Sequence, residues 1–300
     1  MRIAITGVSG QVGWELQRAL QPHGEVVSLD RNALDLSRPE TVRRVIGEIM
    51  PDVILNPAAY TAVDRAEQEP DLARRVNQDS VAELADAAHS CSALLLHYST
   101  DYVFRGDGDR PLSEADTTDP QGVYGRTKLG GELALRGSKA AWLCFRTSWV
   151  YASRGKNFLR TILRLARERE QLRVVADQVG APTCCRLIAD ASVAVLRQAL
   201  RDREQGRFDS QILHLAAAGE TSWHGFAEAI VAGAAELGMP SMAAASVIPI
   251  TTAEYPTPAR RPANSRLDCS LIRSRYGLAL PLWRDGLQLC LMELAAHEWK

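Results

Sequence analysis

The chain has 300 residues, of which 46% are hydrophobic and 24% are charged, and its formal net charge is −1. This balance, with a pI of about 6.6, argues against a general attraction to nucleic acid or to an acidic membrane surface. No apolar run approaches the roughly 18–20 residues of a membrane helix, and the apolar stretch before the first glycines is too short for a signal peptide. We therefore expect a cytoplasmic protein with one large or two modest domains.

The first half of the chain alternates short β-branched runs with segments of helical periodicity. Strands are predicted at 2–6, 25–29, 52–56, 93–98 and 141–147, and helices at 11–20, 39–49, 70–89 and 122–136. Strands that alternate with helices form βαβ units with helices on both faces of a parallel sheet. The expected fold class is therefore α/β, a Rossmann-type doubly wound parallel sheet.

The second half is less regular. Amphipathic helices are predicted at 157–170 and 187–200, and a last helix at about 285–297, whereas 238–266 is rich in Pro, Ala, Ser and Thr and predicts a surface loop. We expect residues 1–150 to form the dinucleotide-binding domain. Residues 151–300 are then mainly a smaller, C-terminal substrate-binding domain, with some later segments crossing back.

Three glycines follow the first predicted strand at the mouth of a helix. Gly7, Gly10 and Gly13 have the spacing G-x-x-G-x-x-G, which is typical of short-chain dehydrogenases/reductases. Glycines permit a tight turn and a close approach of the backbone to a pyrophosphate, while the helix N-terminus offers free N–H groups to the anion. The turn therefore predicts a nicotinamide dinucleotide as cofactor.

The second strand ends at Asp30-Arg31. A carboxylate at this position would accept a hydrogen bond from the ribose 2′-hydroxyl of NADH, whereas an arginine would pair with the 2′-phosphate of NADPH. Because both residues are present, the sequence leaves the choice between NADPH and NADH open.

The fourth strand ends in the segment HYSTDYVF at 97–104, and the motif YGRTK follows at 124–128. Tyr124 and Lys128 lie at i and i+4 on one helix face. An ammonium group beside a phenol stabilises the phenolate and lowers its pKa. With the hydroxyl of Thr100 to hold a carbonyl oxygen, these three residues predict the catalytic set of a reductase.

Seven blocks of the chain together resemble the dTDP-4-dehydrorhamnose reductase family of extended short-chain dehydrogenases/reductases. The blocks, in order from residue 1 to about 290, are GQVGWELQRAL, TAVDRAE, HYSTDYVF, VYGRTKLGGE, FRTSWVY, DQVGAPT and YPTPARRPANSRL. The resemblance implies reduction of the C4 keto group of dTDP-4-dehydro-L-rhamnose to dTDP-L-rhamnose by NADPH or NADH, a step toward surface polysaccharide.

The resemblance also assigns roles to individual residues. Tyr124 would be the proton donor and Lys128 its partner, and both would also contact the cofactor. The remaining cofactor contacts would be Gly7, Gly10, Gln11, Val12, Gly13, Asp30, Arg31, Asp35, Leu36, Ala59, Tyr60, Thr61 and Tyr98. The sugar nucleotide would meet Thr100, Asp101 and Trp149, and we expect at least one of Arg260 and Arg261 to hold its diphosphate, because guanidinium forks bind phosphate oxygens.

Magnesium and a homodimer are implied by the resemblance alone. The six cysteines form no C-x-x-C pair and, like the histidines, show no metal-ligand spacing, so we expect reduced thiols and no metal site. Pro57 stands where the family more often has alanine, so the backbone beside the cofactor is expected to differ slightly.

Two alternative functions compete with reduction. A sugar-nucleotide 4,6-dehydratase or a related epimerase shares the fold, but the dehydratases usually have a second acid after the threonine, where this chain has Asp101 followed by Tyr102. A regulatory subunit that binds nucleotide without turnover could retain Tyr124 and Lys128. The segment TPARRPANSRL argues against that alternative.

Overall fold

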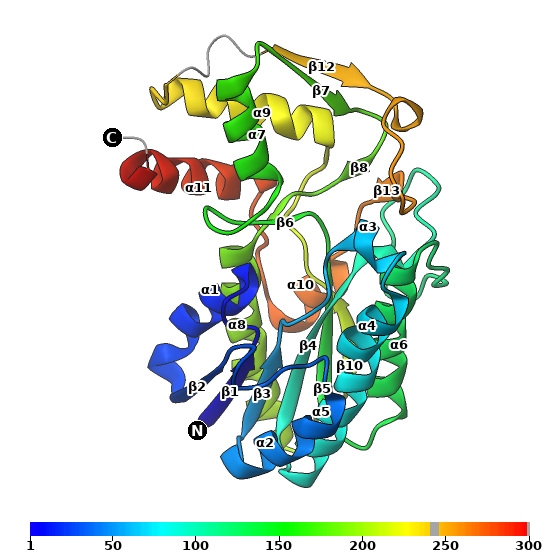
Figure 1. Cartoon of the computed structure of the whole chain (residues 1–300). Coiled ribbons are helices and arrows are strands. Elements are labelled where there is room, and N and C mark those ends of the chain that lie inside the picture. Colours follow the sequence, from blue (N-terminus) through cyan, green and yellow to red (C-terminus); the bar gives the residue numbers. More distant parts are fainter. Residues whose placement is uncertain (241–245, 299–300) are drawn as a thin grey trace.

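The computed structural model describes residues 1–240 and 246–298 and is built around a six-stranded parallel sheet (Figure 1). The strand order is β10-β5-β4-β3-β1-β2, and each neighbouring pair is parallel. The strands of this sheet are β1 (Arg2–Thr6), β2 (Glu25–Leu29), β3 (Val53–Asn56), β4 (Leu94–Thr100), β5 (Ala141–Thr147) and β10 (Gln211–His214). The predicted α/β class with a doubly wound parallel sheet is confirmed, as are its five predicted strands.

The order of the strands reverses between β1 and β3. From β1 the chain runs outward to β2 on one side and, through β3, β4 and β5, to the other. All residues of β3 and β4 are buried, because helices cover both faces of the sheet there. Ligands of such sheets bind outside the carboxyl ends of the strands at this point of reversal. The residues that follow β1, β3 and β4 are therefore the first to consider as a site.

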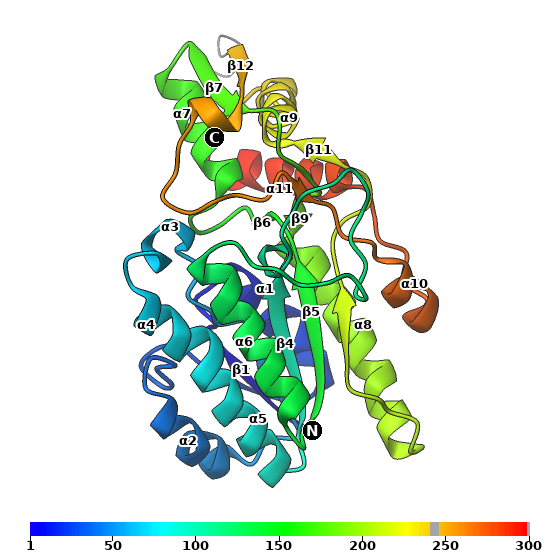
Figure 2. The ribbon, with the colours of Figure 1, turned by 90° about the vertical axis from the view of Figure 1, so that its right-hand side faces the viewer.

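Two apolar cores lie on opposite faces of the sheet (Figure 2). On one face, Ile3 and Ile5 of β1 pack with α1 (Gln11–Leu20) and α8 (Cys185–Glu204), for example with Leu16 and Val195. On the other face, α2 (Val42–Ile49), α5 (Ser80–Ser90) and α6 (Val123–Gly137) cover the sheet. Alternate residues of each strand point to opposite faces, so one apolar strand supplies both cores.

A third core lies in a lobe beyond the carboxyl ends of the strands (Figure 1). It joins α7, α9 and α11 with β7 and includes Phe226, Leu159 and Leu287. The short strands here are β6 (Val150–Tyr151), β7 (Gln171–Val175), β8 (Val179–Gly180), β9 (Thr183–Cys184), β11 (Thr221–Ser222), β12 (Ser246–Ile250) and β13 (Asn264–Ser265). The later elements β10 and α8 return to the central sheet.

The prediction of a loop over 238–266 was wrong in part. Residues 246–250 form β12, which pairs in parallel with β7, and residues 264–265 form β13, which pairs with β8. The Pro and Ser content of the segment hid the strand character of the run SVIPI. Its pairing partner, β7, lies 75 residues earlier in the chain, with Ser246 opposite Gln171. Residues 241–245 of the predicted loop lie outside the described residues.

The predicted helices are confirmed with small shifts of their ends, except that 70–89 is divided. There α4 and α5 are separated by the π-helical turn η3 (Arg75–Asp79). The α-helices are α1 (Gln11–Leu20), α2 (Val42–Ile49), α3 (Val63–Ala66), α4 (Pro70–Arg74), α5 (Ser80–Ser90), α6 (Val123–Gly137), α7 (Phe158–Glu168), α8 (Cys185–Glu204), α9 (Trp223–Glu236), α10 (Ser270–Tyr276) and α11 (Trp283–Glu298). Single 3-10 turns are η1 (Gln21–His23), η2 (Pro39–Thr41), η4 (Asp101–Val103) and η5 (Thr252–Glu254). No helix within the described ranges is long and apolar enough to cross a membrane.

Candidate active site

The glycine turn between β1 and α1 has the geometry that a dinucleotide requires. Gly7 has φ +56°, and a Cβ there would lie 2.8 Å from the Cβ of Ala58. A Cβ on Gly13 would lie 2.3 Å from the Gly7 carbonyl oxygen. No side chain caps the N-terminus of α1, whose N-cap residue is Gly10. The first N–H groups of α1 are therefore available to an anion, and the turn fits the pyrophosphate of a dinucleotide.

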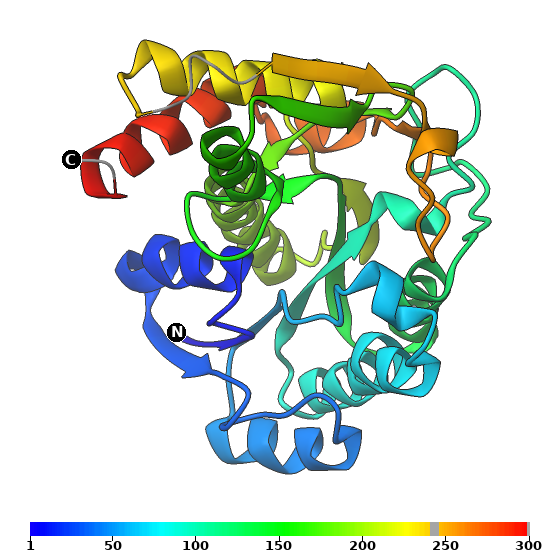
Figure 3. The ribbon, with the colours of Figure 1, turned by 45° about the horizontal axis from the view of Figure 1, so that its top comes forward.

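The loop between β6 and α7 curves over the start of α1 (Figure 3). The Asn157 amide donates to Oε1 of Gln11 over 2.7 Å. The guanidinium of Arg154 lies 3.6 Å from the ring centre of Trp14. Gln11, a predicted cofactor residue, is thus tied to this loop, and the neighbouring Val12 is partly buried against the core. No local pattern in the sequence indicates this contact, which joins residues 146 positions apart.

Asp30 and Arg31, which follow β2, make different contacts. Oδ1 of Asp30 accepts from the backbone N–H of Asn32 and Ala33, each over 2.9 Å, and so holds the turn after β2. Arg31 is exposed, with Nε 3.5 Å from Oδ1 of Asp35. Leu36, also predicted near the cofactor, is buried in the core under this turn. Of these residues, Arg31 presents the charge that a 2′-phosphate would meet.

Asn77 organises the loop after β3, where Ala59, Tyr60 and Thr61 were predicted to line the cofactor. Its Oδ1 accepts from the Tyr60 N–H over 2.8 Å, and its Nδ2 donates to the Tyr60 carbonyl over 3.1 Å. Nδ2 also lies 3.1 Å from Oγ1 of Thr127 on α6. Asn77 is buried in the π-helical turn, and such turns are frequent at functional sites. Sequence analysis missed this residue, although a polar side chain among the apolar positions of 70–89 was a usable signal.

Thr100 and Asp101 lie where β4 ends and η4 begins. The Thr100 hydroxyl accepts from the Tyr102 N–H over 3.2 Å and lies 3.0 Å from Oδ1 of Asp101, to which it donates. The other carboxylate oxygen, Oδ2 of Asp101, is buried and has no hydrogen-bond partner among the described residues. Burial raises the pKa of Asp101 to about 6, against hydrogen bonds that favour the carboxylate. The end of β4 therefore presents a hydroxyl and a carboxylate, and Oδ2 of the carboxylate is available as a hydrogen-bond acceptor for a substrate.

Tyr124, near the start of α6, meets this strand end. Its ring stands edge-on to that of Tyr102 with 5.4 Å between centroids, and its hydroxyl is near enough to the Thr100 side chain for the two to interact. Burial of the hydroxyl raises the pKa of Tyr124 above its ordinary value, while the interaction with Thr100 acts in the opposite direction. The structure therefore brings together Thr100 and Tyr124, as the sequence predicted.

Lys128 lies one turn further along α6 and is almost fully buried, with 1% of its surface exposed. Its Nζ donates to the Tyr98 carbonyl over 2.5 Å and lies 3.3 Å from Nε2 of His97. Burial lowers the pKa of Lys128 to about 8. Among the described residues, no hydrogen bond joins Lys128 to the Tyr124 hydroxyl. The expected lowering of the phenol's pKa is therefore not present in this arrangement, because the ammonium is held by β4.

Tyr98 serves the site through its backbone. Its phenol points to the other face of the sheet, where it bonds to Oγ of Ser192 on α8 over 2.9 Å. Its ring packs on Phe145 with 5.6 Å between centroids. The part of Tyr98 that lies beside the catalytic helix is the carbonyl that accepts from Lys128.

Trp149, predicted to meet the sugar, is stacked on a second tryptophan. Its ring lies 3.7 Å from that of Trp223 at an interplanar angle of 13°. The backbone of Trp149 has φ +49°, a conformation that non-glycine residues rarely adopt. A Cβ on Gly180 would lie 2.7 Å from the Trp149 ring, so only glycine fits beneath it. Trp223, at the start of α9, is a second residue that sequence analysis missed.

Arg261 contacts Tyr102, the ring neighbour of Tyr124, whereas Arg260 contacts Gln121. The guanidinium of Arg261 forms an ion pair of 2.6 Å with Asp64 and donates to the Tyr102 hydroxyl over 3.3 Å. Arg260 is exposed and donates to the side chain of Gln121 over 3.1 Å. Of the two arginines, Arg261 therefore has the better position to meet a substrate beside Tyr124.

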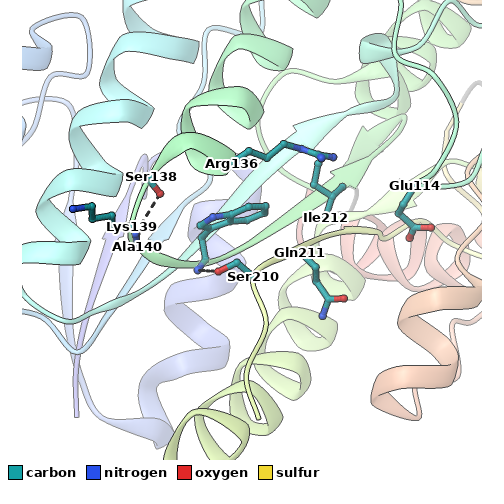
Figure 4. Close-up of a pocket in the computed structure, with 9 residues that line it drawn as sticks. Glu114, Arg136, Ser138, Lys139, Ala140, Ser210, Gln211 and Ile212 are labelled. Carbon is teal, nitrogen blue, oxygen red and sulfur yellow. Dashed lines mark hydrogen bonds between the residues drawn. The ribbon is translucent and has the colours of Figure 1, made fainter. Parts of the chain in front are cut away.

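A separate open hollow of 630 Å³ lies at the opposite, amino ends of β5 and β10 (Figure 4). Its lining includes Arg136, Lys139 and Gln211, and no predicted site residue contributes to it. For metals, no group of three or more His, Cys, Asp or Glu side chains that could hold an ion occurs among residues 1–240 and 246–298.

Comparison with known proteins agrees with this geometry. The family model described as RmlD substrate binding domain matches residues 1–296. A dTDP-4-dehydrorhamnose reductase of Burkholderia thailandensis is 51% identical over 298 residues, which cover 99% of this chain and 100% of the relative. The crystal structure of such a reductase from Clostridium acetobutylicum is 34% identical with a TM-score of 0.88, covering 98% of this chain and 99% of that one.

A second crystal structure adds a bound cofactor. The dTDP-4-dehydrorhamnose reductase of Bacillus anthracis, solved in complex with NADP, is 33% identical with a TM-score of 0.85 and covers 97% of this chain and 99% of its own. The match of the family model over almost the whole length, with a relative at 51% identity, shows the family. This chain belongs to the dTDP-4-dehydrorhamnose reductase family.

Proposed function

We propose that the chain reduces the C4 keto group of dTDP-4-dehydro-L-rhamnose to dTDP-L-rhamnose, with NADPH or NADH as the hydride donor. The observation that carries the proposal is the meeting of the Thr100 and Tyr124 side chains at the carboxyl edge of the sheet, with the buried Lys128 one helical turn further along α6. The NADP bound to the Bacillus anthracis relative supports the cofactor, and the names of the relatives support the substrate.

In this proposal Tyr124 is the general acid. When bound, the dinucleotide supplies the hydride, and the phenol of Tyr124 donates the proton to the carbonyl oxygen as it gains negative charge. The Thr100 hydroxyl now donates to Asp101, so it has to turn toward the carbonyl oxygen to hold it. Lys128 is held by β4 rather than by the phenol, so its ammonium has to approach the Tyr124 hydroxyl during the reaction to favour the phenolate that remains after proton transfer.

We assign the cofactor mainly to residues 1–150 and the sugar nucleotide mainly to the lobe within 151–300. The glycine turn and the loop held by Asn77 both flank the strand reversal, which supports the first assignment. Arg261 and Trp223, on which Trp149 is stacked, come from later segments, which supports the second.

A direct assay tests the function. The protein is mixed with NADPH and dTDP-4-dehydrorhamnose, and oxidation is followed at the nicotinamide absorbance band while the product is identified by NMR. We expect stoichiometric formation of dTDP-L-rhamnose. Binding of NADPH without any oxidation would instead favour the regulatory alternative. Conversion of dTDP-glucose to a 4-keto-6-deoxy product without net cofactor oxidation would favour the dehydratase.

Arg31→Ala should weaken the use of NADPH more than that of NADH. The substitution removes a guanidinium that is available to a 2′-phosphate, and a charged hydrogen bond of this kind is worth about 10-fold or more in KM. The measurement is KM for each cofactor. Arg44→Ala is the matched control, since Arg44 is an exposed arginine paired with a carboxylate four residues away, as Arg31 is. Equal losses for NADPH and NADH would show that Arg31 does not face the 2′ position.

Arg261→Ala should raise KM for the sugar nucleotide by roughly 10- to 100-fold, because a guanidinium that binds a diphosphate makes charge-assisted hydrogen bonds. Arg260→Ala should change it little, because that side chain is exposed and turned toward Gln121. KM for NADPH should stay the same in both variants. If neither variant changes KM for the sugar nucleotide, both arginines are ordinary surface residues.

A further inference from the structure

A row of polar side chains crosses the sheet beneath α6. Thr6 and Asn56 are the last residues of β1 and β3, and His97 lies in the middle of β4, where it pairs with Asn56 in the β3–β4 register. Thr6 Oγ1 lies 2.6 Å from Oδ1 of Asn56, and Nδ2 of Asn56 lies 3.1 Å from Nδ1 of His97. Nε2 of His97 then lies 3.3 Å from Nζ of Lys128. None of the four residues is more than 1% exposed.

This row, which we call the Thr6–Asn56–His97 array, is unexpected in such a place. Fully buried polar side chains are costly unless each is hydrogen-bonded, and the array lies beside the apolar core of this face, which includes Ile54 and Leu95. The array begins next to the glycine turn and ends on the catalytic lysine. Its hydroxyl, amide and imidazole groups contribute neither to the apolar core nor directly to the proton transfer. Their burial beside Lys128 therefore indicates a separate role.

The donors of Lys128 show what the array can do. An ammonium has three N–H donors and no acceptor. One of them goes to the Tyr98 carbonyl and a second points at His97 Nε2. If both bonds form, Nζ is fixed in place and one N–H remains for the cofactor ribose or the Tyr124 hydroxyl.

The protonation state of His97 then follows from hydrogen-bond accounting. Because an ammonium can only donate, Nε2 of His97 must accept, and the ring proton must lie on Nδ1. Nδ1–H needs an acceptor, which the Asn56 amide provides once its oxygen and nitrogen exchange the places given above, so that the oxygen faces the ring and the nitrogen faces Thr6. With the amide nitrogen toward Nδ1, the ring proton would lie on Nε2, and Lys128 would have to be a neutral amine.

We propose that His97 is a positioning residue for Lys128, and that Asn56 and Thr6 hold its imidazole as the neutral Nδ1–H tautomer so that Nε2 accepts from the lysine ammonium. Burial and the charge of Lys128 lower the pKa of His97 well below its ordinary value, which keeps the ring neutral. The other titratable groups that act on Lys128 are the Cys144 thiol on β5 and Glu132 on α6. Burial raises the pKa of Cys144, and Glu132 is paired with Arg146, so neither substitutes for His97.

Two substitutions at Asn56 separate this proposal from a merely structural role. Asn56→Leu removes the acceptor for Nδ1–H, whereas Asn56→Asp keeps the shape and provides a stronger acceptor. The proposal rests on the proposed reductase activity for one readout, the alkaline limb of the pH profile of kcat, where Lys128 loses its proton. That limb should move to lower pH in Asn56→Leu by about one unit, since hydrogen bonds to charged groups are worth that much. It should move to higher pH in Asn56→Asp.

The second readout needs no turnover and no substitution at Asn56. Nitrogen-15 NMR of the histidine-labelled full-length protein distinguishes the two neutral tautomers from each other and from imidazolium. The His97 signal is assigned by its absence from His97→Gln. We expect the Nδ1–H tautomer at pH 7 in the parent protein. An Nε2–H tautomer or an imidazolium there would overturn the proposal, as would alkaline limbs that move in the same direction, or not at all, in the two Asn56 variants. A parent protein without turnover would refute the reductase but leave the tautomer test intact.

Discussion

Tyr124→Phe should lower kcat by roughly 10²- to 10⁴-fold, which is the usual contribution of a general acid. The substitution removes the proton that the phenol delivers but keeps the ring, which packs edge-on against Tyr102. The fold and the affinity for NADPH should therefore survive. Steady-state kinetics with dTDP-4-dehydrorhamnose gives kcat, and quenching of tryptophan fluorescence by NADPH gives the affinity.

Tyr102→Phe is the matched control for Tyr124→Phe. It removes a phenol at a distance of one ring from the reaction, where the hydroxyl accepts from Arg261, so it should change KM more than kcat. If Tyr124→Phe turns over at the parent rate, another group is the acid. Asp101 would then be examined first, through Asp101→Asn, because it is buried beside Thr100 and burial raises its pKa to about 6.

Arg146→Met should destabilise the protein by about 3–5 kcal/mol, because it leaves a buried carboxylate without its counter-charge. Arg146 on β5 and Glu132 on α6 form a two-point ion pair, with Nη2 2.6 Å from Oε2 and Nε 2.9 Å from Oε1. Both side chains are 1% exposed. Ser99 also donates to Oε1 of Glu132 over 2.5 Å, so the pair joins α6 to both β4 and β5. The measurement is the free energy of unfolding in urea.

A double variant shows whether the lost pair or the lost volume is responsible. Glu132→Leu combined with Arg146→Met replaces both charges with apolar groups, and such replacements often cost little. We expect the double variant to be more stable than Arg146→Met alone. Arg164→Met is the control for an exposed pair, where the bond to Glu168 should contribute less than about 1 kcal/mol. An Arg146→Met variant as stable as Arg164→Met would contradict the prediction.

Much of the site could be predicted because its signals are local. Gly7, Gly10 and Gly13 are recognisable from spacing alone, since a tight turn before a helix tolerates few other residues. Tyr124 and Lys128 are one helical turn apart in any α-helix, so their common face does not depend on the rest of the fold. The five apolar strands of the first half were likewise visible, because buried parallel strands are continuous hydrophobic runs.

Other parts of the site depend on partners that are distant in the sequence. The choice between Arg260 and Arg261 is set by Asp64, almost 200 residues earlier, which pairs with Arg261. Trp223 is a candidate site residue because it stacks on Trp149, and Asn77 is one because it hydrogen-bonds the backbone of Tyr60. No periodicity in the sequence indicates such pairs, because the two residues of each pair become neighbours only in the folded chain.

The sequence by itself determined the α/β class, the glycine turn after β1 and the common helix face of Tyr124 and Lys128, because each follows from the spacing of neighbouring residues. Only the tertiary structure decided how that pair is held. The pairing of β1, β3 and β4 aligns Thr6, Asn56 and His97 beneath Lys128, and it turns the lysine ammonium toward the strand rather than toward the Tyr124 hydroxyl. The physical reason is that local spacing fixes which face a residue occupies, whereas strand pairing and helix docking fix what it touches there.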